Sequence, residues 1–330
     1  MNRQKYFSLI HGIRTFLIAV IIIGFIVFLA IGLFGGINQV YNTIISAKWY
    51  IYIFAFVFML CSFSIRFIKW DYYLKRLGIH VPKSKNFQVY LSLYSMDLTP
   101  GRVGRIVSAY SLNRITKKKL ASLIPVVTMD IFTDFLGYGI VALAAAIYFK
   151  TDVLYIAGVD LFLLLPFIFL INNRVYNLIK GLFKNNFLKQ FTLYGDEYFA
   201  SQSSLNRPKV YLVSLLVSVP AAILEACAFF ATSLSIGLEP HLGKTIFVYV
   251  VTELVGMASA LPGAIGVQDG LLVAFSNTVL GYDKAISSAV TIMTRLATLW
   301  FGVAIGSIFL IYTFRYWDEK KKKDKKTPNK

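Results

Sequence analysis

The segment Pro100-Gly101-Arg102-Val103-Gly104 recurs in altered form as Pro262-Gly263-Ala264-Ile265-Gly266. These segments hold the only two Pro-Gly steps of the 330-residue chain, and each interrupts a hydrophobic stretch. Proline removes a backbone donor and glycine admits positive φ angles, so the pattern ends a helix. In a bilayer such a break is tolerated where it is buried in protein or lines a cavity. Two breaks at corresponding places indicate a transporter built from inverted repeats, with its binding site at the breaks.

The composition is typical of an integral membrane protein. Hydrophobic residues make up 57% of the chain and charged residues 15%, whereas soluble domains carry about 25% charged residues. Long apolar runs exceed the roughly 20 residues that cross about 30 Å of hydrocarbon. Six runs are long enough to span, at residues 16–36, 49–67, 121–149, 153–171, 210–236 and 285–314.

The basic residues predict the orientation of the chain in the membrane. Of the 34 lysines and arginines, 29 fall in segments 1–15, 66–119, 172–209 and 315–330. The positive-inside rule places these segments on the cytoplasmic side. Both termini of this multi-pass protein are therefore expected on the cytoplasmic side of the cell membrane. The charges are spread over connections between spans without a recognition motif, which argues against nucleic-acid binding.

Two hydrophobic segments remain beside the breaks. Residues 87–98 would form a helix of roughly 18 Å, too short to cross, and cytoplasmic charges flank the segment. We therefore expect a re-entrant hairpin that enters from the cytoplasm and turns at the first break. Residues 245–261 and 267–280 surround the second break. They form either a hairpin from the outside or two thin full spans, and the charge pattern does not decide between these.

The predicted fold is an all-α polytopic membrane protein with six full spans and two Pro-Gly-broken hairpins, or up to eight or more hydrophobic helices. Residues 1–314 form one transmembrane domain, with inverted repeat halves at about 16–149 and 153–314. Each half follows the order span, span, hairpin, span. Residues 315–330 are expected to form a basic, disordered cytoplasmic tail attracted to anionic lipid.

Several charged residues fall inside the predicted spans or beside the second break. A charge at mid-bilayer costs about 2.5–3.5 kcal/mol on insertion scales, so these residues are expected to be paired or to line a polar path. Arg295 could neutralise one carboxylate and fix helix packing, but that reading leaves the other acids unexplained. The spacing of Asp130 and Asp134 puts both on one helix face. The acids are Asp130, Asp134, Asp160, Glu225, Glu253 and Asp269.

Arg102 and Arg105 lie three residues apart at the first break. Guanidinium groups match phosphate geometry, and a helix start adds free N–H donors. A phospholipid headgroup is the natural anion for this site. The alternative is that both arginines snorkel to cytoplasmic headgroups and only anchor the hairpin.

These motifs resemble the flippase-like membrane family of the lysylphosphatidylglycerol synthase transmembrane region. The similarity covers roughly residues 10–314 and includes both Pro-Gly motifs, the run Asp130-Ile131-Phe132-Thr133-Asp134 and Arg295. Members of that family are polytopic proteins implicated in moving or handling lipids, and some archaeal relatives are linked to polyprenyl-phosphate sugar pathways. The resemblance implies a lipid-related role for this chain.

The chain departs from the family pattern at four positions. Asp269 stands where members usually have Glu, and Arg105 where an acid is common. Ile131 and Gln268 replace basic residues, so a different charge network or headgroup is implied. Only 16 residues follow Phe314, so the soluble aminoacyl-transferase domain of the full synthase is not expected here, nor is synthesis of lysylphosphatidylglycerol.

The sequence favours a lipid transporter or flippase-like protein over an enzyme. The expected partner is an anionic phospholipid or a polyprenyl phosphate, together with a homo-oligomer or a separate transferase. No cofactor and no metal site are expected, because the three histidines are far apart in sequence. Three alternatives remain. One is a membrane-embedded glycosyltransferase with Asp130 and Asp134 as base. The others are an accessory or scaffold protein and an ion channel or ion-coupled exchanger for small solutes. The predicted substrate-binding residues are Pro100, Gly101, Arg102, Gly104, Arg105, Asp130, Asp134, Pro262, Gly263, Gly266, Asp269 and Arg295.

Overall fold

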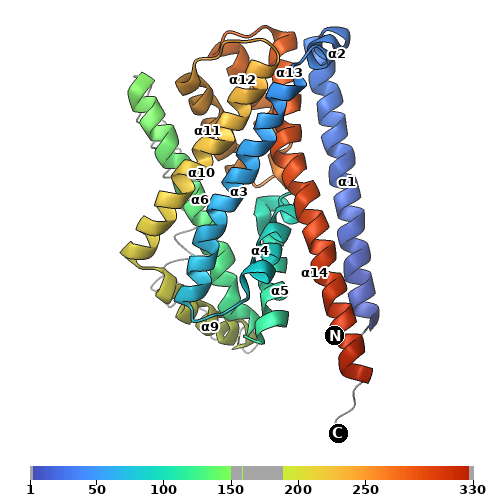
Figure 1. The fold of residues 1–330 in the computed structure, drawn as a ribbon, viewed down its shortest axis with the longest axis vertical. Helices are drawn as coiled ribbons and strands as arrows, with labels where there is room; N and C mark the ends of the chain where they lie inside the picture. Colours follow the sequence, from blue (N-terminus) through green and yellow to red (C-terminus); the bar gives the residue numbers. More distant parts are fainter. Residues whose placement is uncertain (1–2, 150–157, 159–188, 327–330) are drawn as a thin grey trace.

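The computed structural model describes residues 3–149, 158 and 189–326, and every element in that part of the chain is helical (Figure 1). Long helices alternate with two pairs of shorter ones that are joined by irregular turns. In chain order the elements are α1 (Arg3–Gly35), α2 (Ile37–Ile45), α3 (Trp49–Arg76), α4 (Lys83–Ser92), η1 (Leu93–Met96), η2 (Pro100–Arg105), α5 (Ile106–Thr116), α6 (Leu120–Phe149), α9 (Lys189–Leu205), α10 (Pro208–Ser235), α11 (Leu242–Ala258), η4 (Pro262–Ala264), α12 (Val267–Thr278), α13 (Lys284–Arg295), η5 (Leu296–Trp300) and α14 (Phe301–Lys326).

Five helical segments in the described part of the chain are long and apolar enough to cross a membrane, which confirms five of the predicted spans. They are Ile18–Gly35, Trp49–Arg76, Leu120–Phe149, Pro208–Ser235 and Lys284–Thr313. The sixth predicted span, residues 153–171, lies outside the described residues, as does Asp160. The sequence also predicts disorder from Arg315, but α14 continues to Lys326 through a run of lysines, which are good helix formers.

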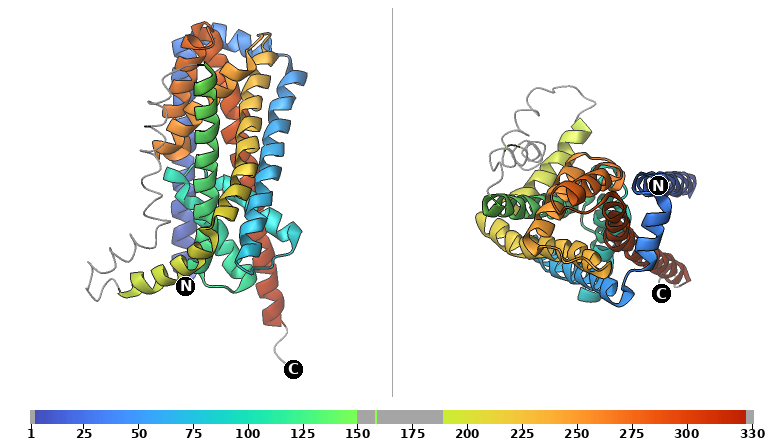
Figure 2. Two further views of the ribbon diagram at one scale, coloured as in Figure 1. Left: turned by 90° about the vertical axis from the view of Figure 1, so that its left-hand side faces the viewer. Right: turned by 90° about the horizontal axis from the view of Figure 1, so that it is seen from above.

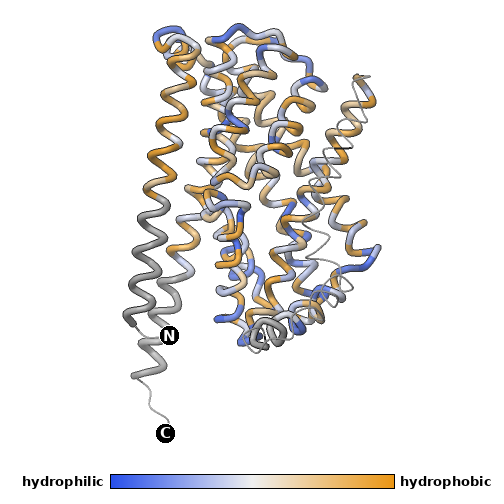
Figure 3. The backbone as a smooth tube through the Cα atoms, turned by 180° about the vertical axis from the view of Figure 1, so that it is seen from behind, coloured by the Kyte–Doolittle hydropathy of each residue, from blue (hydrophilic) through white to orange (hydrophobic). Residues whose placement is uncertain are grey.

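The long helices carry hydrophobic residues along their middle parts, and hydrophilic residues gather toward both ends of the molecule (Figure 3). The outward face of α1 is strongly apolar: Ile22 is 54% exposed and Phe25 is 70% exposed. Lipid chains would cover such a face, because they are as apolar as the side chains themselves. Seen along its long axis, the molecule has α1 on its periphery beside α14 (Figure 2).

The two pairs of short helices approach the middle of the molecule from opposite ends (Figure 1). The pair α4 and α5, of 10 and 11 residues, lies in the half that holds both termini. The pair α11 and α12, of 17 and 12 residues, lies in the other half. None of the four is among the candidate spans of the described residues. Both Pro-Gly motifs therefore sit at the inner tips of helix pairs.

The backbone takes the same conformation at both breaks. Gly101 and Arg102 have φ angles of 57° and 58°, and Gly263 and Ala264 have φ angles of 59° and 54°. The tips also bond to each other, since Gly101 N donates to the carbonyl of Ala260 at 3.1 Å and Gly263 N donates to the carbonyl of Asp97 at 3.2 Å. Backbone groups freed by the breaks thus find partners on the opposite tip, as a buried chain requires.

Close helix contacts at small residues hold these tips in place. A side chain at Gly137 on α6 would meet Ser218 of α10 at 2.8 Å, and one at Gly306 on α14 would meet the backbone of Ser95 at 2.2 Å. Near-contact of backbones at glycine is the usual mode of helix association in membranes. The α6–α10 contact and the α14–hairpin contact therefore fix the walls around the breaks.

The helix α9 lies across the end of the molecule that also holds the start of α1 and the end of α14 (Figures 1 and 2). Lys119, in the connection between α5 and α6, donates a hydrogen bond to Glu197 of α9. This bond raises the pKa of the exposed Lys119 ammonium. The contact ties α9 to the base of the first hairpin.

Candidate functional site

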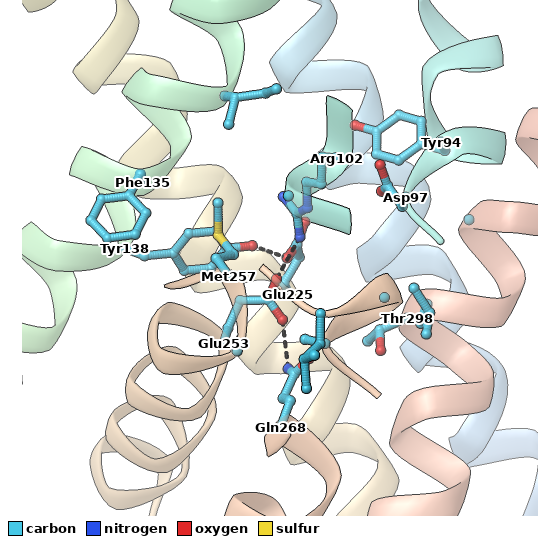
Figure 4. Close-up of a pocket in the computed structure, with 18 of the residues that line it drawn as sticks. Tyr94, Asp97, Arg102, Phe135, Tyr138, Glu225, Glu253, Met257, Gln268 and Thr298 are labelled. Atoms are coloured by element: carbon cyan, nitrogen blue, oxygen red, sulfur yellow. Dashed lines mark hydrogen bonds and ion pairs between the residues drawn. The ribbon is translucent and has the colours of Figure 1, made fainter. Parts of the chain in front are cut away.

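A cavity of about 630 Å³ lies where the two broken hairpins meet. Its walls come from both tips and from the long helices α3, α6 and α10 together with α11 and the α13–α14 segment (Figure 4). Part of the lining is apolar, with Met59, Phe63, Phe135, Met257 and Leu299. The charged residues that line it are Arg66, Asp97, Arg102, Arg105, Glu225, Glu253 and Arg295.

Arg102 connects the two hairpins across the cavity. Its Nη2 donates to Oε1 of Glu253 on α11 at 2.7 Å, and Gln268 of α12 donates to the other oxygen of Glu253 at 2.5 Å (Figure 4). The Arg102 side chain is 21% exposed, more than any other cation of the buried ion pairs around the cavity. Arg102 also stands at positive φ, which is strained for a residue with a β-carbon. The backbone thus holds this guanidinium at the cavity surface.

Arg105 is bound more tightly than Arg102. Its Nε and Nη2 donate to the two oxygens of Asp97 at 2.6 and 2.8 Å, which is the bidentate arrangement that suits a guanidinium and a carboxylate. A longer contact of 3.5 Å joins its Nη1 to Asp130 of α6. The Arg105 group also lies over the ring of Tyr94, 5.3 Å from the centroid. Arg105 therefore connects the first hairpin to α6.

Arg295 supports the second break. Its Nε donates to Asp269 at 2.9 Å, its Nη2 donates to the carbonyl of Gly263 at 2.5 Å, and its Nη1 donates to Gln268. The second oxygen of Asp269 accepts from Gly266 N at 2.7 Å and so caps the start of α12. A carboxylate is stabilised there by the free N–H groups of the helix start. Arg295 and Asp269 together fix the conformation of the η4 turn and of the start of α12.

The inward face of α3 supplies two further cations. Arg66 donates to Glu225 of α10, lies 3.1 Å from Asp134 and donates to the Tyr138 hydroxyl at 3.0 Å. Lys69 donates to Asp134 at 2.7 Å and lies 3.2 Å from Asp130. Both side chains are buried because α6 and α10 pack against this end of α3.

The structure brings the twelve predicted site residues together around one cavity, in three different positions. Gly101, Arg102, Arg105, Gly263 and Arg295 line it. Asp130, Asp134 and Asp269 are buried, outside the lining, each in contact with a cation. The remaining four shape the turns: Pro100, Gly104, Pro262 and Gly266.

Arg66, Lys69 and Asp97 were not among the predicted site residues. The two cations were counted with the basic cytoplasmic segment 66–119, and Asp97 lies in the predicted hairpin segment 87–98, whose acid was not considered. The second span was expected to end at residue 67, whereas α3 runs to Arg76. A usable signal was present, since Arg66, Lys69 and Tyr73 recur at the spacing of one helix face. Glu225 and Glu253 were recognised as membrane acids but not as site residues. Their lining role depends on the packing of α10 and α11.

Metal binding has no support in the described part of the chain, where no group of three His, Cys, Asp or Glu side chains is placed to hold an ion. Cys61 and Cys227 are free thiols on different helices. The charged groups of the cavity instead form ion pairs and charge-assisted hydrogen bonds.

Comparison with known proteins identifies the family of this chain. Residues 17–306 match the model of a family described as the lysylphosphatidylglycerol synthase transmembrane region. A UPF0104 membrane protein of Methanothermobacter thermautotrophicus is 21% identical over 85% of this chain and 89% of its own length. Another of Methanocaldococcus jannaschii is 23% identical over 92% of this chain and 96% of its own length. The family match includes both breaks and all twelve predicted site residues, so this chain belongs to the family of the lysylphosphatidylglycerol synthase transmembrane region.

Proposed function

We propose that this protein binds the phosphate-bearing headgroup of a membrane lipid in the cavity between the two breaks and moves it between the leaflets. The observation that carries the proposal is Arg102, the most exposed cation of the network. Among the described contacts its guanidinium makes one hydrogen bond, whereas a guanidinium has five N–H donors. A phosphate oxygen would take the donors that remain.

The cavity suits such a ligand in size and in character. A volume of about 630 Å³ exceeds what a phosphate needs and falls in the range of small-molecule sites. The apolar wall around Phe135 and Met257 offers a surface for the glycerol or the start of an acyl chain, while Arg102 would hold the phosphate (Figure 4). An apolar wall beside a few charged groups is what an amphipathic lipid requires.

The arrangement of the hairpins supports a transport role. We propose that the pair α4 and α5 is re-entrant from the cytoplasm and that the pair α11 and α12 is re-entrant from the outside, as halves of an inverted repeat. In the described residues, each pair follows one candidate span and precedes another: α3 and α6 for the first pair, and α10 and the segment Lys284–Thr313 for the second. Transporters of this plan gate one repeat against the other around a fixed site at the breaks.

The membrane-embedded glycosyltransferase is less well supported by the geometry. A catalytic base must be within hydrogen-bond reach of the substrate. Asp130 and Asp134 are 2% exposed and in contact with Lys69. They are not among the residues that line the cavity.

A transport assay with matched variants tests the proposal. Purified protein is reconstituted in vesicles that contain a fluorescent anionic phospholipid, and the fraction of label reduced from outside is followed over time. We expect Arg102→Ala to slow transport at least tenfold and Arg102→Lys to retain part of the rate. Arg114→Ala is the control, because Arg114 is exposed on α5 and contacts Tyr110 away from the cavity. Equal rates for Arg102→Ala and the wild type would exclude this site.

Cysteine labelling tests the proposed orientation. In a variant without Cys61 and Cys227, a single cysteine at Lys118 is expected to react with impermeant reagent only from the cytoplasmic side. A cysteine at Lys244 should react only from the outside. Both positions are exposed. Lys118 lies between α5 and α6 and Lys244 lies in the first turn of α11, and the two helix pairs occupy opposite halves of the molecule (Figure 1). Labelling of both from the same side would contradict the hairpin arrangement.

A further inference from the structure

The buried charges around the breaks do not balance. The network contains five cations and six carboxylates within the described residues, and most of them are less than one-tenth exposed. The cations are Arg66, Lys69, Arg102, Arg105 and Arg295, and the carboxylates are Asp97, Asp130, Asp134, Glu225, Glu253 and Asp269. With every group ionised, the network would carry one unmatched negative charge.

Five carboxylates each have a cation of their own. Asp97 binds Arg105 at 2.6 Å, Glu253 binds Arg102 at 2.7 Å and Asp269 binds Arg295 at 2.9 Å. Asp134 binds Lys69 at 2.7 Å, and Glu225 binds Arg66. Each of these pairs is the shortest contact of its cation to a carboxylate. Asp130 is the carboxylate that remains.

Asp130 makes only weak contacts with the neighbouring cations. Its Oδ1 accepts no hydrogen bond, although Lys69 Nζ lies 3.2 Å away, and its Oδ2 accepts one bond of 3.5 Å from Arg105. The Lys69 ammonium already donates to Asp134, Thr133, Ser218 and the carbonyl of Asp130, which exceeds its three N–H bonds. A buried carboxylate without adequate partners favours its neutral form.

The groups around Asp130 come from every element that packs on this part of α6. The α3 helix contributes Arg66, Lys69 and the Tyr73 hydroxyl, the first hairpin contributes Arg105, Asp97 and Tyr94, and α6 itself contributes Asp134. The α10 helix contributes the hydroxyls of Ser214 and Ser218, and α9 places Gln202 against the adjacent Met129. The three cations among them are committed to Asp97, Asp134 and Glu225.

We propose that Asp130 is a proton-binding site that is neutral in the arrangement described here and ionises when Arg105 leaves Asp97. One proton from water binds to a carboxylate oxygen, and the same O–H bond breaks on release, with no other covalent change. Ionised Asp130 would draw Arg105 away from Asp97. Because Arg105 belongs to the first break, the proton would be linked to the position of the hairpin tip.

The proton site itself stands without the transport proposal, and only its coupling to lipid movement rests on it. Arg105 acts as a positioning residue in this scheme, since it connects Asp130 to the tip that carries Arg102. Asp269 is less suited to the task, because both of its oxygens accept short hydrogen bonds. The change between protonated and ionised carboxylate would therefore be linked to the first hairpin and not to the second.

Infrared spectroscopy of the full chain in lipid vesicles tests the site directly. At neutral pH, after subtraction of the ester bands of the lipid, we expect a carbonyl stretching band of the buried Asp130 carboxylic acid. Asp130→Asn should lose that band and keep the thermal stability of the wild type, because asparagine has the shape and charge of the neutral acid. Asp71→Asn, near the end of α3 and outside the network, should keep the band. A band that persists in Asp130→Asn, or a strongly destabilised Asp130→Asn, overturns the proposal.

A second variant and a transport measurement separate the two proposals. Asp134→Asn frees Lys69 for Asp130, so the carboxylic acid band should disappear although Asp130 is intact. Persistence of the band in Asp134→Asn would contradict the pairing scheme. In vesicles with a pH gradient, wild-type lipid transport should respond to the gradient and Asp130→Asn should not. If the infrared bands behave as expected but the protein moves no lipid, the proton site is supported and the proposed transport function is rejected.

Discussion

The two breaks share one backbone conformation but obtain their positive charge in different ways. The first break carries Arg102 and Arg105 within its own turn. The second has Ala264 at the position of Arg102 and is supported by Arg295 from α13, about thirty residues further along the chain. Arg102 is part of the first turn and lines the cavity. The guanidinium of Arg295, by contrast, donates hydrogen bonds to Asp269, to Gln268 and to the carbonyl of Gly263 in the second turn. Under the proposed function, the first break would contact the ligand, and the second break would hold the architecture.

The largest effect that this comparison predicts is on stability at Arg295. Arg295→Ala leaves Asp269 buried without its cation, and breaking such a pair costs about 3–5 kcal/mol. Arg102→Ala should cost much less, because Arg102 is partly exposed and Glu253 keeps its bond to Gln268. Thermal unfolding of both variants in detergent measures the difference. The double variant Arg295→Met/Asp269→Asn should recover part of the lost stability, since it leaves no buried charge unpaired. Equal losses of stability in Arg102→Ala and Arg295→Ala would contradict the different roles of the two breaks.

A smaller effect separates the two glycines that follow proline. Gly101 and Gly263 have nearly the same positive φ, so alanine brings the same backbone strain to both, about 1–2 kcal/mol. Only Gly263 is tightly enclosed: its added β-carbon would lie 3.1 Å from Leu98 and Leu299, while that of Gly101 would lie 3.9 Å from Ala260. We expect Gly263→Ala to lower the melting temperature further than Gly101→Ala. The reverse order would show that the tips are packed differently.

The smallest predicted effect is a gain. Ala264 has a φ of 54° and carries a methyl group where Arg102 carries a guanidinium at the matching position of the first break. Ala264→Gly relieves the strain of about 1–2 kcal/mol, partly offset by the greater freedom of glycine in the unfolded chain. A net stabilisation of less than about 1 kcal/mol is expected. Ala274→Gly in the exposed interior of α12 is the control and should destabilise by about 1 kcal/mol. A loss of stability in Ala264→Gly would mean that the β-carbon of Ala264 makes contacts worth more than the strain.

The breaks are predictable from the sequence because proline and glycine act locally. The absence of a donor at Pro262 and the positive φ at Gly263 need no knowledge of the rest of the chain. The same holds for the five confirmed spans, which follow from length and hydropathy alone, and for the family. The re-entrant course of the hairpins and their inverted relation stay predictions, which the helix lengths and the opposite directions of the two pairs support.

Only the tertiary structure decided which cation pairs with which carboxylate. Arg66 and Lys69 read as cytoplasmic in sequence because hydropathy falls where α3 nears its end, yet packing of α6 and α10 buries both. Their partners Asp134 and Glu225 are 65 and 159 residues away. A helix period tells which face a residue occupies, but not what lies opposite, since that depends on how distant helices pack. The sequence thus determined the membrane-embedded helices and their two interruptions, and the fold alone left Asp130 as the carboxylate whose neighbouring cations, Lys69 and Arg105, lie closer to other acids.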